Sequence, residues 1–150
     1  MALIELYSDK ILDIAGNALQ PGRLATPDAS ARKVSRVCGS VVEVDIVLTD
    51  GVISAYGHEI SACALGQTSA AIVAREIVGT RAEDFLRLAQ QMRDMLKAAG
   101  APPDGKWSDL GYLEVVREYP ARHASTMLVF DAVIDAIEKA QVKPKPEDAS

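Results

Sequence analysis

Residues 40–60 of the chain read SVVEVDIVLTDGVISAYGHEI, and this stretch decides the fold. Apolar side chains alternate from Val42 to Leu48, as they do in a strand with one buried face. Thr49-Asp50-Gly51 joins this run to a second one, Val52 to Ile60, because Asp-Gly is a favoured hairpin turn. A further short strand is expected from the segment before Cys38. The stretch therefore predicts a small antiparallel sheet, which needs helices against one face to be stable.

Helices are predicted on both sides of the hairpin. Apolar side chains recur with helical spacing from Leu3 to Asn17, from Ala70 to Ile77 with a glycine stop at Gly79, from Thr80 to Leu96, and from about His123 to Ala140. Thr80 and Glu83 match the capping box at the start of the third of these helices. The predicted fold class is α+β, with the sheet packed against helices.

Two further segments have weaker signals. The stretch from Gln20 to Lys33 contains Pro21, Gly22 and Pro27, which predicts an irregular connection. Ser108 and Asp109 are expected to cap a short helix that Pro120 interrupts.

Length and composition predict one globular domain. The chain has 150 residues, of which 49% are hydrophobic and 25% charged, enough to bury a core. The domain is expected over residues 1–140, and residues 141–150, rich in proline and lysine, are expected to form a disordered tail. There is no apolar run of about 20 residues to cross a bilayer and no basic, apolar leader, so we expect a cytoplasmic protein with no membrane partner. A net charge of -5 without a Lys/Arg cluster argues against nucleic acid as a partner.

The candidate chemical groups are the two cysteines, Cys38 and Cys63. Cys63 is expected where a strand ends and a helix begins, and unpaired N–H groups at a helix N-terminus stabilise a thiolate. The positions of two isolated cysteines in the sequence are equally consistent with inert thiols packed in the core. The lone histidines His58 and His123 are more often packing or surface residues than ligands.

A series of short motifs then connects these cysteines to a known family. In chain order they are Leu6 to Asp13, Val37-Cys38-Gly39, Asp50 to Ile53, Ala62-Cys63, Val78-Gly79-Thr80 and Pro120-Ala121-Arg122. From about Leu3 to Ala140 the chain resembles the NifU/IscU/SufU family of iron-sulfur cluster assembly scaffolds. The segment from Trp107 to Glu114 resembles the insertion that marks the SufU branch.

The resemblance implies a SufE/NifU-like fold, in which a three-stranded antiparallel sheet is backed by helices. It implies a site at one end of the sheet that holds an iron-sulfur cluster or zinc. The implied partners are a cysteine desulfurase, which supplies sulfur, and other assembly factors. Such a protein is a scaffold and not an enzyme.

The chain departs from the family pattern at the metal site. The family uses three cysteines and an Asp, and these four positions fall here on Cys38, Ser40, Cys63 and Ser125. A serine hydroxyl stays protonated near neutral pH and is a poor ligand for zinc or iron. Two ligands are therefore absent, and a closed four-coordinate site cannot be built from Cys38 and Cys63 alone. The replacements weighed here are His123, His58 or Glu59, a second subunit, and a small thiol.

Three functions remain open at this point. In the first, the protein holds iron or a labile cluster through Cys38 and Cys63. In the second, Cys63 accepts persulfide sulfur from a cysteine desulfurase without a metal. In the third, the scaffold has lost metal handling and has an interaction or regulatory role, with Cys38 and Cys63 as packed thiols and Ser125 as a helix cap.

Overall fold

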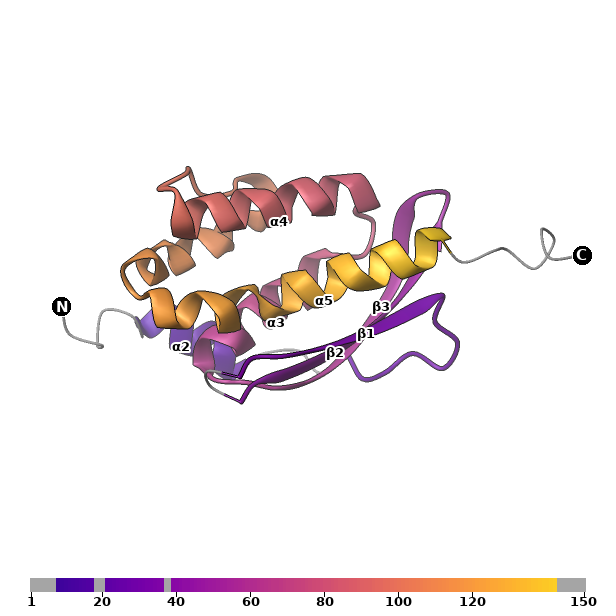
Figure 1. Cartoon of the computed structure of the whole chain (residues 1–150), viewed down its shortest axis with the longest axis horizontal. Coiled ribbons are helices and arrows are strands. Elements are labelled where there is room, and N and C mark those ends of the chain that lie inside the picture. Colours follow the sequence, from indigo (N-terminus) through magenta and orange to yellow (C-terminus); the bar gives the residue numbers. More distant parts are fainter. Residues whose placement is uncertain (1–7, 18–20, 37–38, 143–150) are drawn as a thin grey trace, which may run out of the picture.

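The chain forms one sheet with helices stacked on one face, α5 (His123–Val142) and α3 (Ala64–Glu76) against the strands and α4 (Ala82–Lys97) against α5. The computed structural model describes residues 8–17, 21–36 and 39–142. The sheet has three antiparallel strands in the order β1-β2-β3: β1 (Ala29–Val34), β2 (Val41–Thr49) and β3 (Val52–Ser61). Figure 1 shows the strands running side by side beneath the helices. The predicted α+β fold with a three-stranded antiparallel sheet is confirmed.

The hairpin between β2 and β3 forms as the sequence predicts. Asp50 and Gly51 have positive φ angles of 53° and 80°, the pair of left-handed residues that a type I′ turn requires. The turn matches the twist of the flanking strands. Beyond a bulge between Val47 and Leu48, the register pairs Ile46 with Tyr56 and continues to Val41 opposite Ser61. The alternate apolar residues of β2 consequently face the helices.

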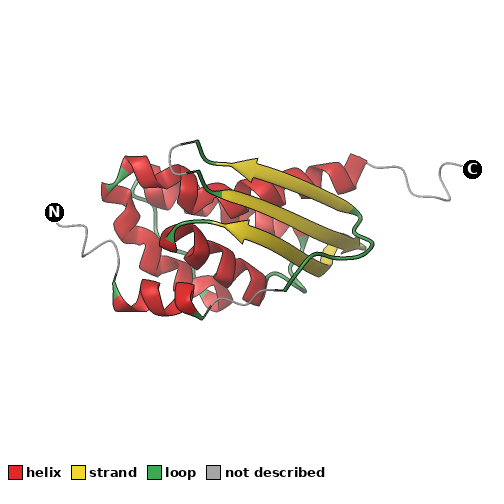
Figure 2. Ribbon diagram, turned by 90° about the horizontal axis from the view of Figure 1, so that it is seen from below, coloured by secondary structure: helices red, strands yellow, loops and turns green. Residues whose placement is uncertain are grey.

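Six helical segments follow the topology of the chain. In chain order they are α2 (Asp9–Gly16), α3 (Ala64–Glu76), α4 (Ala82–Lys97), the 3-10 helices η1 (Gly105–Glu118) and η2 (Pro120–Arg122), and α5 (His123–Val142), all within the described ranges. The long helix α5 packs along β1 and β2, and α3 packs against α2 and α5. Figure 2 shows the strands in front of these helices when the molecule is seen from below. The sheet therefore has one face buried against helices and one face without them.

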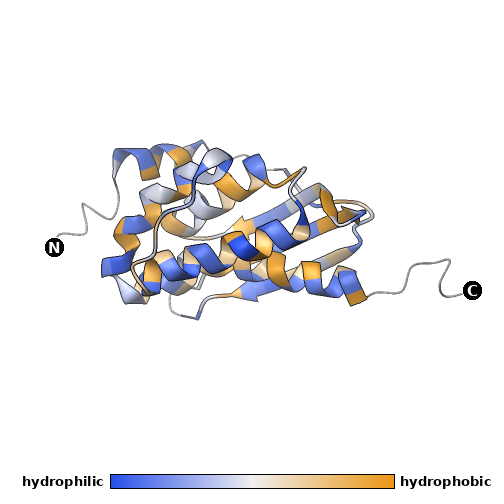
Figure 3. Ribbon diagram, turned by 90° about the horizontal axis from the view of Figure 1, so that it is seen from above, coloured by the Kyte–Doolittle hydropathy of each residue, from blue (hydrophilic) through white to orange (hydrophobic). Residues whose placement is uncertain are grey.

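The core lies between the sheet and the helices. Its largest buried side chains include Phe85, Phe130, Ile46, Ile53 and Ile72. Helix α4 is strongly amphipathic, with one stripe in the core and hydrophilic residues turned outward, as Figure 3 shows from the helix side. No helix in the described part of the chain is long and apolar enough to cross a membrane.

The start of the sheet differs from the sequence prediction. Strand β1 begins at Ala29, inside the stretch to Lys33 that was expected to be irregular. Its residues have little strand propensity, and pairing with β2 stabilises them. The strand expected before Cys38 is present.

The predicted capping box at α4 is wrong. The N-cap is Arg81, without a side-chain cap bond, and the Thr80 hydroxyl instead donates to the Glu76 carbonyl and accepts from Lys106 Nζ at 2.7 Å. Thr80 therefore links the end of α3 to the start of η1.

The short helix expected after Ser108 is a 3-10 helix and not an α-helix. Its apolar residues recur at every third position, at Trp107, Leu110, Leu113, Val116 and Tyr119, and Leu110, Leu113 and Val116 are fully buried. Residues three apart are eclipsed in a 3-10 helix, so this period gives one continuous apolar stripe.

The described ranges limit what can be said of the first helix and of the C-terminal domain boundary. Only Asp9–Gly16 of the helix predicted from Leu3 is described, since residues 1–7 lie outside the described ranges. Helix α5 continues to Val142, two residues beyond the domain boundary expected at residue 140. Residues 143–150, the rest of the predicted tail, lie outside the described ranges.

Candidate functional site

Cys63 lies at one end of the sheet, between β3 and α3. It is the N-cap residue of α3, with extended backbone angles, and its side chain makes no cap hydrogen bond. The thiol is half-buried and is not part of a disulfide. The predicted position at a helix N-terminus is therefore correct.

Ser125 is the hydrogen-bond partner of this thiol. It lies in the first turn of α5 and is 2% exposed. The Cys63 thiol donates to Ser125 Oγ across 3.8 Å, and Ser125 Oγ donates to the Arg122 carbonyl at 3.3 Å. Ser125 is inside the helix, so the interpretation of this residue as a helix cap is wrong. The fold brings together two positions that are 62 residues apart in sequence.

The separation of these two atoms can be compared with that of two ligands of a metal ion. In a tetrahedral site with bonds of about 2.0–2.3 Å, neighbouring donor atoms lie about 3.3–3.8 Å apart. The 3.8 Å between Cys63 Sγ and Ser125 Oγ falls at the upper end of that interval. The distance is therefore compatible with a shared metal ion as well as with the hydrogen bond, and the ligand role of Ser125 stays a prediction.

A glycine allows this approach. A Cβ placed on Gly66 would lie 2.9 Å from the Ala62 Cβ and 3.3 Å from the Ser125 carbonyl oxygen. Both distances are shorter than normal contacts, so a larger residue would separate the start of α3 from the start of α5. The absence of a side chain at Gly66 thus permits the close approach of the two helix starts that carry Cys63 and Ser125.

Ser40, another position of a predicted family ligand, lies directly before β2. Ser40 is 2% exposed, and its carbonyl accepts from the Ser35 N–H at 2.8 Å, which closes the connection from β1. Cys38 lies outside the described residues. The predicted meeting of Cys38 and Cys63 in one pocket therefore stays a prediction.

The histidines have partners of their own. His123 Nε2 lies 3.0 Å from the Val116 carbonyl of η1, and His123 is 9% exposed. A carbonyl oxygen only accepts, so Nε2 carries a proton and Nδ1 holds the lone pair in the neutral ring. His58 is buried on the helix side of β3, where its Nδ1 is 2.9 Å from the Tyr56 hydroxyl. Glu59, next to it in the strand, points to the opposite face.

The described residues contain no group of three His, Cys, Asp or Glu side chains that could hold a metal ion. Within those ranges Cys63 is thus a single strong donor beside one weak donor. The described residues at this end therefore do not fit a closed structural zinc site.

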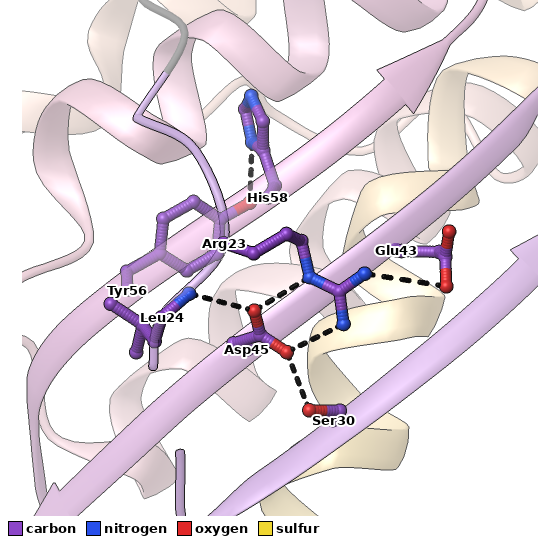
Figure 4. Close-up of polar contacts among 7 residues, drawn as sticks. All are labelled: Arg23, Leu24, Ser30, Glu43, Asp45, Tyr56 and His58. Atoms are coloured by element: carbon purple, nitrogen blue, oxygen red, sulfur yellow. Dashed lines mark hydrogen bonds and ion pairs between the residues drawn. The ribbon is translucent and has the colours of Figure 1, made fainter. Parts of the chain in front are cut away.

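A polar network on the outer face of the sheet was not predicted. Asp45 accepts from Arg23 Nε at 2.6 Å, from Arg23 Nη2 at 2.9 Å and from the Leu24 N–H at 3.0 Å. The Ser30 hydroxyl donates to the same carboxylate, and Arg23 also pairs with Glu43. Figure 4 shows Arg23 between the two carboxylates, with Tyr56 and His58 beside the network.

This network buries a charge under the segment before β1. The Arg23 guanidinium is the main cause that lowers the pKa of Asp45 from 3.8 to about 2, and burial raises the pKa of Tyr56 above its ordinary value. The alternation of β2 predicts that Asp45 faces solvent. Its side chain is only 1% exposed, because the segment at Arg23 and Leu24 covers it. The alternation of residues within a strand cannot predict that a distant segment covers its outer face.

Known proteins of similar sequence and fold share this architecture. The chain is 44% identical to a NifU-like nitrogen-fixing protein (N-terminal) from Brucella abortus, with 94% of this chain and 98% of that chain covered and a TM-score of 0.91. It is 26% identical over 136 residues to the iron-sulfur cluster assembly scaffold protein IscU of Thermotoga maritima, covering 89% of this chain and 94% of that protein. No family model matches the chain.

A further solved structure shows the fold alone. A putative iron-sulfur cluster assembly scaffold protein for the SUF system from Fervidobacterium islandicum is 18% identical, with a TM-score of 0.82 over 91% of this chain and 99% of that chain. Fold and site together define an α+β protein of the NifU/IscU/SufU type. The chain belongs to the NifU-like family of iron-sulfur cluster assembly scaffold proteins.

Proposed function

We propose that this protein works in iron-sulfur cluster assembly and holds iron or a labile cluster through Cys38 and Cys63. The observation that carries the proposal is the 3.8 Å contact between Cys63 Sγ and Ser125 Oγ, in a chain 44% identical to a NifU-like protein. The cluster is cargo here, so the role is that of a carrier and not of a catalyst.

The residues of the site have separate tasks in this proposal. Cys63, at the N-cap of α3, supplies the sulfur ligand. Ser125 keeps the thiol in one position through its bond to Arg122 and ligates iron weakly at most. A site with fewer thiolates releases its metal more readily, which suits transfer to a recipient protein.

A sulfur acceptor is the second candidate, and the surroundings of Cys63 favour it. A persulfide forms when a desulfurase passes its outer sulfur atom to an attacking thiolate, and the desulfurase cysteine leaves as a thiolate. The half-buried thiol of Cys63 has no cap bond and lies at a helix N-terminus, as an attacking thiolate requires. The partner in both candidates is a cysteine desulfurase.

A cytoplasmic location belongs to the same proposal. Free thiols and labile clusters persist in a reducing compartment, where glutathione and thioredoxin keep cysteines reduced. Other assembly factors are expected as recipients of the cargo.

Anaerobic reconstitution tests the proposal. Purified protein is incubated with ferrous iron and sulfide, and the visible absorption of the cluster is recorded for the wild type, Cys63→Ala and Thr68→Val. We expect a cluster spectrum in the wild type and in Thr68→Val, and none in Cys63→Ala. Equal spectra in the wild type and Cys63→Ala, or no cluster in the wild type, would overturn the proposal.

The same variants separate the two candidates. After incubation with cysteine and a cysteine desulfurase, intact-protein mass spectrometry shows whether sulfur has been added to Cys63. Added sulfur on wild-type protein that never forms a cluster favours the acceptor. A protein with neither a cluster nor added sulfur is the outcome that a metal-free interaction module predicts.

A further inference from the structure

Strand β1 is at an edge of the sheet. The strand order is β1-β2-β3, and within the described ranges β1 pairs with β2 alone. An edge strand presents a row of backbone N–H and C=O groups on the side that has no neighbouring strand. Another extended polypeptide can add to a sheet at such an edge.

The register of the sheet shows which backbone groups face this edge. The Ser35 N–H donates to the Ser40 carbonyl at 2.8 Å, which continues the antiparallel register of β1 and β2. Alternate residues of a strand direct their backbone groups to the same neighbour. Lys33 therefore also bonds to β2, whereas Arg32 and Val34 direct their N–H and C=O groups to the open edge.

The open part of the edge begins at Arg32. The carbonyl of Ser30, which faces the same way, accepts a hydrogen bond from Lys139 Nζ of α5 at 3.3 Å. The backbone groups of Arg32 and Val34 have no such partner in the part of the chain that the structure describes. Both residues are exposed, and Val34 is 46% exposed although it is apolar.

A groove with an apolar floor borders this edge on the helix side. Its volume is about 460 Å³, and it lies between the end of β1, with Lys33 and Val34, and the face of α5 that carries Leu128 and Ile134. Side chains alternate between the two faces of a strand. Every second side chain of an added strand would therefore enter this groove and cover Leu128 and Ile134.

The charges on the edge decide what kind of strand it accepts. Arg32 and Arg36 are exposed and make no ion pair with a described residue. In a second copy of this chain, the run of Arg32, Lys33 and Arg36 would lie opposite itself, and like charges in that position destabilise strand pairing. The edge therefore favours an acidic strand over its own copy.

We infer that the edge of β1 binds an extended acidic segment of a partner protein, which adds to the sheet as a fourth, antiparallel strand. Its N–H and C=O groups bond to those of Arg32 and Val34. Its acidic side chains lie on the outer face beside Arg32, and its apolar side chains enter the groove over Leu128 and Ile134. This inference goes beyond the proposed function and does not depend on a metal at Cys63.

The probe is the peptide acetyl-Glu-Val-Glu-Val-Glu-Val-amide, which has the alternation that the edge and the groove require. It is titrated into the metal-free protein, and amide NMR shifts and hydrogen exchange are recorded. We expect shifts concentrated in β1 and in residues 124–138 of α5. We also expect exchange at the Arg32 and Val34 amides to be fast in the free protein and severalfold slower with the peptide bound.

Two N-methylated peptides test the backbone pairing on the unchanged protein. In an antiparallel pair, residues directly opposite each other share a face, so the glutamates opposite Arg32 and Val34 donate their N–H groups to β1. Methylation of the glutamate amides should abolish binding. Methylation of the valine amides, which face solvent, should leave binding within about twofold of the unmodified peptide, less than the loss of one hydrogen bond. Equal effects of the two modifications, or the reverse preference, would overturn the inference.

Two pairs of variants test the edge from the side of the protein. Val34→Pro removes an N–H that faces away from β2, which an edge strand tolerates, and should weaken binding about two- to tenfold, while Val34→Ala keeps the N–H and most of the affinity. Arg32→Gln should weaken binding about two- to fivefold, and Arg87→Gln, an equal change of charge on α4 outside the groove, should not.

Thermal unfolding shows whether each variant is folded, and if Val34→Pro is not, the N-methylated peptides decide the question. No binding of the peptide, shifts centred away from β1, or exchange at Arg32 and Val34 unchanged by the peptide would show that the cations of this edge only keep other strands away. Each of these results overturns the inference and leaves the proposed function standing.

Discussion

At the scale of single residues, Gly66 controls the geometry of the site. A methyl group there would lie 2.9 Å from the Ala62 Cβ and 3.3 Å from the Ser125 carbonyl oxygen, so Gly66→Ala crowds both the junction before α3 and the contact with the start of α5. We expect a loss of about 1–3 kcal/mol in the free energy of unfolding, as for other overpacked sites, and loss of cluster assembly. Urea denaturation checks the first effect. Gly16→Ala is the control, since nothing lies within 4 Å of a Cβ at Gly16 and its stability should not fall.

A pair of adjacent hydroxyls in α3 gives a second prediction at this scale. Ser69 Oγ is fully buried and has no hydrogen-bond partner among the described residues, whereas Thr68 donates to the Ile11 and Ala64 carbonyls. Ser69→Ala removes an unsatisfied group and should raise the free energy of unfolding by about 1 kcal/mol. Thr68→Val should lower it by about the same amount. Thermal unfolding of the two variants measures both signs, and a stability loss in Ser69→Ala would contradict the assignment.

At the scale of elements, the segment before β1 is held by the ion pair of Arg23 and Asp45. The pKa of Asp45 is about 2 in the folded chain and 3.8 without its partners, a difference worth about 2 kcal/mol. A lowered pKa in the folded state stabilises the fold above about pH 4, where the unfolded chain also holds an ionised carboxylate. This contribution is lost as the pH falls from about 4 to 2.

Asp45→Asn tests this pH dependence. We expect the variant to be less stable than the wild type at pH 6, with a smaller difference at pH 2.5, in urea denaturation series. Asp50→Asn, a change in the exposed hairpin turn that keeps the turn chemistry, is the control. The assignment of Asp45 would be wrong if its variant lost the same stability at both pH values.

The sequence predicts elements where a local signal exists. The hairpin follows from strand alternation and Asp50-Gly51, and α4 follows from its apolar stripe. Prediction of an element from the sequence fails where the apolar residues repeat with a period other than that of an α-helix or strand, or where a distant contact stabilises the element. The residues of η1 repeat every third position, and the strand β1 depends on pairing with β2. Thr80 matches a helix cap in the local sequence, but its hydroxyl instead accepts a hydrogen bond from Lys106, which is 26 residues away in sequence.

At the scale of the whole molecule, the site depends on contacts that spacing does not show. Cys63 and Ser125 are 62 residues apart, and only the family resemblance suggested that they meet. The fold places them at one end of the sheet because β3 ends at Ser61 and α5 begins beside α3.

The central claim is that the frame of a family metal site survives around Cys63, with Ser125 in a ligand position. Titration of Ser125→Cys with Co²⁺ under anaerobic conditions tests this claim most directly, because the sulfur-to-cobalt charge-transfer absorption reports the number of bound thiolates. We predict stoichiometric, tetrahedral Co²⁺ binding with more thiolate absorption than in the wild type, lost again when Cys63→Ala is added. If Ser125→Cys binds Co²⁺ no better than the wild type, or binds it equally well without Cys63, the two positions do not share a metal centre.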